Sequence, residues 1–175
     1  MFNLKEFKPT ILFLVKFAGL YLVLSLLYGW YVKSNNPKPD AVTISVTQQT
    51  SALLQVLGWE TTIFNYENKP TTSVVHKDRG IISVYEGCNG INMVIIFLSF
   101  LFGFGPINKK LAWFAPLGIL LIHLFNLGRL LALFWVVIYL PGALYFTHKY
   151  LFTAFIYAVV FGLWIVWMRM NFKKA

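Results

Sequence analysis

The chain has 175 residues, of which 58% are hydrophobic and 12% are charged. Soluble domains carry about 45–50% apolar residues, even when glycine is counted, and about 25% charged residues. The composition excludes disordered, collagen-like and disulfide-stapled chains, and it favours a membrane protein because lipid can cover so much apolar surface. The net charge of +9 is not gathered in one basic run, so we expect no nucleic-acid binding.

The first predicted membrane helix is the apolar run 11–32, which follows Lys5 and Lys8. A helix needs about 20 apolar residues to cross a bilayer, and this run is that long. A cleavable signal peptide would have a shorter apolar region and an A-x-A-like site, so this helix is expected to remain uncleaved.

Residues 33–87 differ in composition and predict a polar extracytoplasmic insertion. Five of the six acidic residues lie there: Asp40, Glu60, Glu67, Asp78 and Glu86. Residues 42–58 mix polar and apolar side chains, as in a surface-lying amphipathic helix that ends at a glycine. The β-branched and aromatic stretches 61–66 and 73–85 predict short strands, with a turn at 77–80. The insertion is therefore expected to form a small α+β cap.

Three further apolar runs predict membrane helices over about 88–105, 111–140 and 150–168. The run 111–140 would form a helix of about 45 Å, longer than the hydrocarbon core, so it must tilt, protrude or break. A break near Gly128 into two half-helices is the alternative arrangement. The predicted fold class is an all-α integral membrane protein, a single membrane domain (1–175) with about four transmembrane helices and the small cap.

Basic residues at the ends of these runs predict how the helices are oriented. Cytoplasmic segments are enriched in lysine and arginine, whereas long loops cross the membrane largely regardless of their charge. The short basic segments hold Lys5, Lys8, Lys109, Lys110, Arg169, Lys173 and Lys174. Both termini are therefore predicted on the cytoplasmic side, and 33–87 and 141–149 on the outer side.

Cys88, Arg129 and His148 are all predicted at the outer face. Cys88 begins the second run and His148 lies in the outer connection. Arg129 follows Lys110 by about 28 Å of helix, nearly one hydrocarbon thickness. An imidazole can take the proton of a thiol, and an always-charged guanidinium can stabilise an oxyanion. Each residue also has an ordinary alternative: a packed cysteine, a snorkelling arginine and a loop histidine.

Other roles and classes stay open at this stage. Glu86 is a candidate to orient His148 or to close the cap, and mid-span His123 is expected to be packed or hydrogen-bonded. The main alternative class is a non-enzymatic multi-pass membrane protein, such as a transporter subunit or an assembly factor. A haem or metal protein using the two histidines is disfavoured, because one lies mid-span and the other at the face. A rhomboid-type serine protease is disfavoured because no G-x-S-G element is present.

Three short motifs resemble those of the exosortase and archaeosortase family. The segment YEGCNGI at 85–91 resembles the E-x-C-x-G segment of the family, and NLGR at 126–129 resembles its N-x-x-R segment. His148 matches the third position, and the order and spacings agree. The resemblance covers about residues 40–170. The chain is short for the family and looks like its compact bacterial form, close to exosortase F.

The resemblance implies a membrane-embedded cysteine protease or transpeptidase of the bacterial cell inner membrane, with its active site on the outer face. It would cleave C-terminal sorting signals of exported proteins through a thioester, with no cofactor and no metal. Cys88 would be the nucleophile, Arg129 the oxyanion stabiliser and His148 the general base and then acid. Asn126 would orient Arg129, and Glu86 would support the site.

The partners that the resemblance implies are exported proteins with a C-terminal sorting helix and the lipid bilayer. Many members of the family have about eight spans, whereas four are predicted here. A membrane partner protein that supplies further helices is therefore an open alternative.

Overall fold

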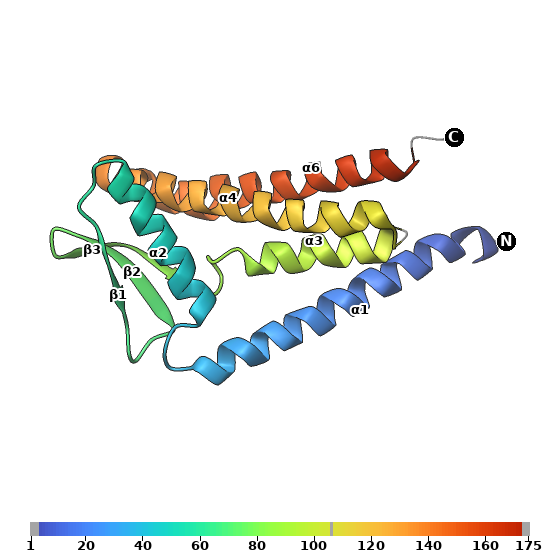
Figure 1. Cartoon of the computed structure of the whole chain (residues 1–175), viewed down its shortest axis with the longest axis horizontal. Helices are drawn as coiled ribbons and strands as arrows, with labels where there is room; N and C mark the ends of the chain where they lie inside the picture. Colours follow the sequence, from blue (N-terminus) through green and yellow to red (C-terminus); the bar gives the residue numbers. More distant parts are fainter. Residues whose placement is uncertain (1–3, 106, 173–175) are drawn as a thin grey trace.

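The computed structural model describes residues 4–105 and 107–172. In chain order its elements are α1 (Leu4–Asn35), α2 (Ala41–Val56), β1 (Thr62–Asn65), β2 (Thr71–His76), β3 (Arg79–Tyr85), α3 (Ile91–Phe104), α4 (Lys109–Tyr139), the 3-10 turn η1 (Pro141–Ala143), α5 (Leu144–Phe146), the π-helical turn η2 (Thr147–Leu151) and α6 (Phe152–Phe172). The long helices run along one axis, and α2 and the sheet gather at one end of them (Figure 1). Both chain ends lie at the opposite end.

Within residues 4–105 and 107–172, three helical segments are long and apolar enough to cross a membrane: Phe7–Asn35, Lys109–Tyr139 and Pro141–Asn171. This finding is consistent with a membrane protein. The apolar helix α3 has 14 residues, or about 21 Å against a hydrocarbon core of about 30 Å. The count of four crossings therefore stays a prediction. Helix α4 runs unbroken through Gly128, so the two half-helices considered as an alternative are not formed.

The cap begins with α2, as the sequence predicts. Asp40 caps its first turn by accepting hydrogen bonds from the backbone N–H groups of Val42 and Thr43, both at 3.0 Å. The helix ends before Gly58, whose φ of +87° lies in the left-handed region that favours glycine. The buried face mixes both kinds of side chain: Val46, Leu54 and Thr47 are buried, whereas Leu53 is 39% exposed.

Threonines can line this buried face because their hydroxyl groups are hydrogen-bonded within the helix. The hydroxyl of Thr47 donates to the carbonyl oxygen of Thr43, and that of Thr50 to the carbonyl oxygen of Val46, both at 2.8 Å. A buried hydroxyl that keeps a hydrogen bond avoids most of the cost of leaving water. Helix α2 therefore packs on the sheet with a face of mixed polarity rather than an apolar stripe.

The predicted strands form one antiparallel sheet in the order β1-β2-β3. The stretch 73–85 folds back on itself at the predicted turn, where Lys77 and Asp78 take positive φ values of 49° and 61°. A β-bulge interrupts the β2–β3 pairing between Val74 and Val75. The carboxyl end of β3 points the chain back toward the helices, where the next turn carries Cys88.

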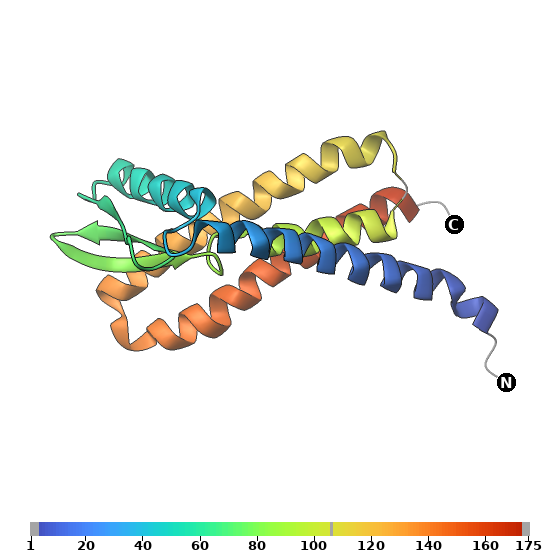
Figure 2. The same cartoon turned by 90° about the horizontal axis from the view of Figure 1, so that it is seen from below.

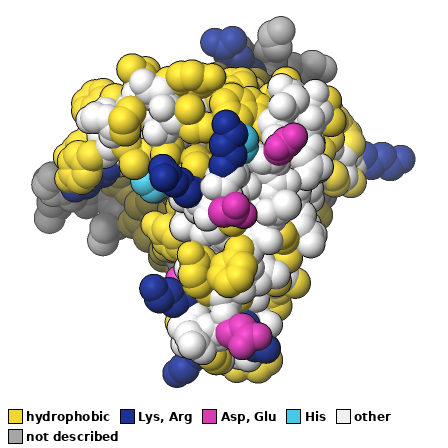
Figure 3. Space-filling view, turned by 90° about the vertical axis from the view of Figure 1, so that its left-hand side faces the viewer, with side chains coloured by type: hydrophobic (Ala, Val, Ile, Leu, Met, Phe, Trp, Pro, Cys, Tyr) yellow, Lys and Arg dark blue, Asp and Glu magenta, His cyan; other side chains and the backbone are white. Residues whose placement is uncertain are grey.

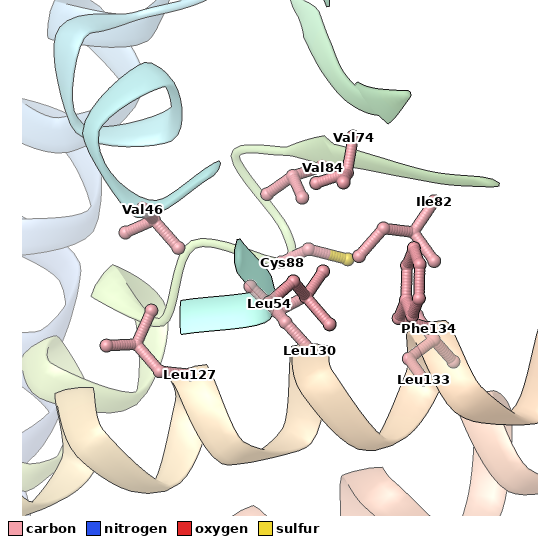
Figure 4. Close-up of a cluster of buried hydrophobic side chains, with 10 residues drawn as sticks. All are labelled: Val46, Leu54, Val74, Ile82, Val84, Cys88, Leu127, Leu130, Leu133 and Phe134. Carbon is pink, nitrogen blue, oxygen red and sulfur yellow. The ribbon is translucent and has the colours of Figure 1, made fainter. Parts of the chain in front are cut away.

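The molecule has two buried apolar clusters. The cap-end cluster joins the cap to α4 and consists of Val46, Leu54, Val74, Ile82, Val84, Cys88, Leu127, Leu130, Leu133 and Phe134 (Figure 4). The aromatic cluster joins α3, α4 and α6 and consists of Phe97, Phe100, Leu101, Leu111, Phe114, Ile122, Val160 and Trp167. Helix α1 adds the partly buried Phe13 and Phe17 to the aromatic cluster. Figure 2 shows how α4 and α6 lie alongside one another and turn at the cap end.

Candidate active site

Cys88 lies in the tight turn between β3 and α3. Its backbone N–H donates to the carbonyl oxygen of Tyr85 at 2.7 Å. Gly90 then begins α3 with a φ of +91°, a conformation that costs other residues about 1–2 kcal/mol. The side chain of Asn89 accepts from the backbone N–H of Ile91 at 3.1 Å. The glycine and the asparagine thus fix where the cysteine sits relative to the helix.

Two side chains of α4 hold the backbone carbonyl of Cys88. Asn126 donates to this oxygen from Nδ2 at 3.1 Å, and Arg129 donates from Nη2 at 3.0 Å. Their spacing of three residues places both on one helix face. Gly90 makes room for the contact, because a Cβ there would lie 3.2 Å from Asn126. Asn126 therefore binds the same carbonyl as Arg129, whereas the family resemblance implied that it would orient Arg129.

Cys88, Arg129 and His148 all line one pocket of about 560 Å³ at the cap end of the helices. The complete lining is Tyr85, Gly87, Cys88, Arg129, Leu144, Tyr145, His148, Lys149 and Thr153. Arg129, His148 and Lys149 are basic, and none of the lining side chains is acidic. The arrangement brings together the three residues that the sequence predicted at one face.

His148 reaches the pocket from a helix and not from a loop. The sequence predicted 141–149 as an outer connection, but this stretch is helical and leads directly into α6. Pro141 begins it, as proline favours the first turn of a helix, and no helix-breaking residue follows Gly142 before α6. His148 itself lies in the π-helical turn η2, a type of turn that is frequent at functional sites.

The side chain of Cys88 also belongs to the protein interior. It is 3% exposed and packs in the cap-end cluster with aliphatic neighbours such as Val84 and Leu130 (Figure 4). A buried cysteine of this kind behaves as a small apolar residue. The thiol therefore has two surroundings, the apolar cluster on one side and the basic pocket on the other.

Arg129 keeps unused hydrogen-bonding capacity in the pocket. Its Nη2 binds the Cys88 carbonyl, but its buried Nε has no hydrogen-bond partner in the described part of the chain. A buried donor without a partner costs about 1–3 kcal/mol. Arg129 thus lines the pocket with donors that the Cys88 carbonyl does not occupy.

Tyr85 is a pocket residue that the sequence reasoning missed. Gly87 allows its ring to fold over the turn, because a Cβ at that position would lie 2.5 Å from Cε2 of Tyr85. The negative charge of the Cys88 thiolate, together with burial, raises the pKa of Tyr85 above its ordinary value. The phenol therefore remains a protonated donor beside the sulfur. The sequence does contain a pattern that could have predicted this contact: a tyrosine three residues before the cysteine, with a glycine between them.

Glu86 and His123 lie away from this pocket. Glu86 lines a separate cavity of about 410 Å³ with residues of α1, including Tyr28 and Lys33. Within the described residues no hydrogen bond joins Glu86 to His148, which was one of its two candidate roles, the other being to close the cap. His123 is hydrogen-bonded, as predicted: its Nε2 lies 2.6 Å from Oε1 of Gln49, which links α4 to α2. Residues 4–105 and 107–172 contain no cluster of side chains suited to a metal ion.

No protein family, curated protein or solved structure matched the chain when it was compared with them. The class of the protein therefore rests on its own geometry. The described part of the chain is predominantly helical, with three helices long and apolar enough to cross a membrane and a small three-stranded sheet. At the end that carries the sheet, a cysteine, an arginine and a histidine share one pocket.

Proposed function

We propose that this protein is a membrane-embedded cysteine peptidase or transpeptidase that cleaves C-terminal sorting signals of exported proteins. The observation that carries the proposal is the convergence of Cys88, Arg129 and His148 on one pocket. They come from the β3–α3 turn, from α4 and from η2, so the fold has to bring them together. The residue types match the requirements of acyl transfer: a nucleophile, a base and a donor for an oxyanion.

The reaction begins when an imidazole nitrogen of His148 takes the proton of the Cys88 thiol. The sulfur attacks the scissile carbonyl carbon, and the C–S bond forms as the carbonyl oxygen becomes an oxyanion. The guanidinium of Arg129 stabilises that charge through a donor that Cys88 does not occupy. When the intermediate collapses, the C–N bond breaks and His148 gives its proton to the leaving amine. Water or an acceptor amine then releases the acyl group from the thioester.

The rigid position of Arg129 favours this mechanism. Donors that stabilise an oxyanion are effective when they are already oriented before the reaction. Arg129 and Asn126 are both held by the Cys88 carbonyl, which ties the donor and the nucleophile to the same turn. The neighbouring Tyr85 phenol supplies a further protonated donor at the pocket.

The distribution of charge favours a pocket on the outer face of a bacterial inner membrane, with both termini cytoplasmic. The α3–α4 turn with Lys109 and Lys110 lies at the same end of the molecule as the termini (Figure 1). The surface at the cap end instead presents charged side chains of both signs among apolar ones (Figure 3). Short segments in which basic residues outnumber acidic ones are typical of the cytoplasmic side, and Glu6 is the one acidic residue in these segments.

The test is loss of processing in variants of the three residues. Cys88→Ala, Arg129→Ala and His148→Ala should each remain in the membrane and abolish shortening of exported proteins that end in an apolar helix and a basic tail. The measurement is intact mass of those proteins after co-expression, together with an acyl adduct on Cys88 that hydroxylamine releases. His123→Ala is the control and should process normally. Unchanged processing by Cys88→Ala would contradict the proposal that Cys88 is the nucleophile.

The burial of Cys88 favours one competing function, a non-enzymatic membrane protein in which the cysteine only packs. Cys88→Val separates the two, because valine is a slightly larger apolar residue without a thiol. A packing role predicts that Cys88→Val preserves function and that Cys88→Ser, with its buried hydroxyl, impairs it. The catalytic role predicts that both variants are inactive.

A further inference from the structure

The cavity of about 410 Å³ that Glu86 lines is a second polar site, separate from the reaction pocket. We name it the α1 cavity, because α1 supplies much of its wall, including Tyr28 and Lys33. The opposite wall includes Glu86 from the turn after β3 and Asn92 from the first turn of α3. It shares no lining residue with the reaction pocket. A ligand bound here would therefore not occupy the space beside the thiol.

Glu86 brings a carboxylate to this cavity without a partner. Its buried atom Oε2 has no hydrogen-bond partner within the described residues. Lys33 lines the same cavity but does not reach this oxygen. A buried carboxylate oxygen is costly in this state, because it has left water without gaining a donor. A ligand with a positively charged donor would supply the missing hydrogen bond.

Other groups on the wall of the α1 cavity suit a negative charge. Lys33 contributes an ammonium group, and Asn92 contributes a side-chain amide. The hydroxyl oxygen of Tyr28 accepts from Nδ2 of Asn89 at 2.7 Å, which leaves the proton of this hydroxyl able to donate. The cavity thus combines an unpartnered acceptor with a cation and neutral donors. This combination matches a ligand that carries both an ammonium and an anionic group.

The position of the α1 cavity along α1 indicates where such a ligand comes from. The candidate membrane span Phe7–Asn35 ends beside the cavity, at the end of the molecule that carries the sheet (Figure 1). The lining residues Ser25 and Lys33 are separated by about 12 Å of helix, so the cavity lies along the last turns of the span. Lipid head groups lie at this level, and the exposed Trp30 is of a type enriched there.

We propose that the α1 cavity binds the head group of an aminophospholipid. The ammonium group of the lipid donates to Oε2 of Glu86, and its phosphate accepts from Lys33 and from the hydroxyl of Tyr28. The bound head group joins α1 to the cap, because its two charges contact opposite walls of the cavity. The inference goes beyond the proposed function, since the lipid takes no part in acyl transfer.

The test measures lipid binding to the full-length protein in detergent by native mass spectrometry, with short-chain phosphatidylethanolamine as the probe. Glu86→Gln should weaken binding at least about tenfold, because it removes a charged hydrogen bond. Glu67→Gln is the matched control at an exposed glutamate of the cap that does not line the cavity. Lys33→Gln should also weaken binding, whereas Lys38→Gln, at an exposed lysine outside the lining, should not.

Two further probes test the chemistry and the source of the ligand. Phosphatidylglycerol has the phosphate but no ammonium group, so it should bind at least about tenfold more weakly. Equal binding of phosphatidylglycerol, or unchanged binding in Glu86→Gln, would overturn the site. Soluble phosphoethanolamine has the same charges without acyl chains and should bind more weakly than the lipid. Equal affinity for it would overturn the lipid as the ligand and identify a free solute instead.

Stability without lipid separates this site from a structural role of Glu86. If Glu86 only closes the cap, Glu86→Gln should lower the melting temperature and leave lipid binding unchanged, which would overturn the proposal. If Glu86 serves the ligand, the lipid-free melting temperature should hold or rise, because an unpartnered buried charge is removed. Cys88→Ala should bind the lipid normally. Normal lipid binding together with processing that does not depend on Cys88 would contradict the proposed function and leave the lipid site intact.

Discussion

The two ends of this molecule are packed by different means. At the end near the chain termini, rings interlock: Phe100 stacks on Trp164 at 4.3 Å and Phe114 stacks on Trp167 at 5.3 Å. At the cap end the buried neighbours are mostly aliphatic, with Phe134 as an aromatic exception, and buried polar side chains are interspersed with them. Asn126 and Asn89, both 2% exposed or less, bind the turn that carries Cys88 or the helices beside it.

The difference shows that buried, hydrogen-bonded asparagine side chains are placed at the cap end. Asn89 alone joins three elements, since its amide donates to the hydroxyls of Tyr28 on α1 and Thr43 on α2 and its oxygen accepts from the start of α3. A hydrogen bond depends on the distance and angle between donor and acceptor. Apolar contact between rings is much less directional, so it fixes positions less tightly. We infer that the aromatic end holds the helices together and that the cap end fixes the positions of reactive groups.

Glycine is needed at each end for a different reason. At the end with the aromatic cluster, Gly118→Ala tests whether glycine is needed for close packing against a ring. A Cβ at Gly118 would overlap the ring of Phe97, which is fully buried and cannot move aside. Overpacking of this kind costs about 1–3 kcal/mol, more than the gain of up to about 1 kcal/mol from replacing a helical glycine. The melting temperature in detergent should therefore fall. Gly162→Ala, with open space around it, should hold or raise the melting temperature.

Gly90→Ala tests the cap end, where the reason for glycine is the backbone. With a φ of +91° and Asn126 at 3.2 Å from the added Cβ, alanine would be both strained and crowded. The expected loss of stability is about 1–2 kcal/mol, concentrated near the turn. Hydrogen exchange should therefore speed up in residues 86–91 while α6 stays protected. An equal increase at both ends would contradict the separation that we infer.

The sequence predicted the elements well because their signals are local. Long apolar runs mark α1, α4 and α6, and α3 covers Ile91–Phe104 within the predicted span 88–105. The hairpin turn at 77–80 follows from its charged and glycine residues. The stretch 141–149 was predicted as a connection, whereas it is helical: Pro141-Gly142 follows the end of α4, as predicted, but also begins the next helical segment.

The site could be predicted only in part. The direction of the helices and the spacing from Lys110 predicted that Cys88, Arg129 and His148 lie at one membrane face. The structure places them in one pocket. Their contacts depend on how separate elements pack, and no spacing rule gives that information. The burial of Cys88, the shared carbonyl and the ring of Tyr85 over Gly87 are all of this kind.

Asn126→Ala has a smaller expected effect on stability than either glycine variant. It removes one of the two donors on the Cys88 carbonyl and leaves Arg129 at 3.0 Å, so the oxygen keeps a partner. The loss of one net hydrogen bond is about 0.5–1.5 kcal/mol. Ser99→Ala is the matched control at a buried serine of α3, whose hydroxyl donates to the carbonyl oxygen of Ile95. Under the proposed function, Asn126→Ala should slow processing, whereas Ser99→Ala should not.

The smallest effect that we predict is a change in the ionisation of Tyr85. The Cys88 thiolate raises the pKa of Tyr85 because a second negative charge beside the first is unfavourable. The folded protein therefore resists losing this proton, whereas an unfolded tyrosine loses it near its ordinary pKa of about 10. This contribution to stability is fully present below about pH 10 and is lost as the pH rises through the folded pKa.

Removing the thiol should reverse that shift. In Cys88→Ala the largest cause of the raised pKa is gone, so Tyr85 should ionise at a lower pH than in the unmodified protein. The measurement is phenolate absorbance during an alkaline titration, with the matching Tyr85→Phe variant subtracted in each background because the chain has 9 tyrosines. Identical titration curves in the two backgrounds would show that the phenol and the sulfur do not interact. In that case Tyr85 would be a wall of the pocket and not a donor to its reactive centre.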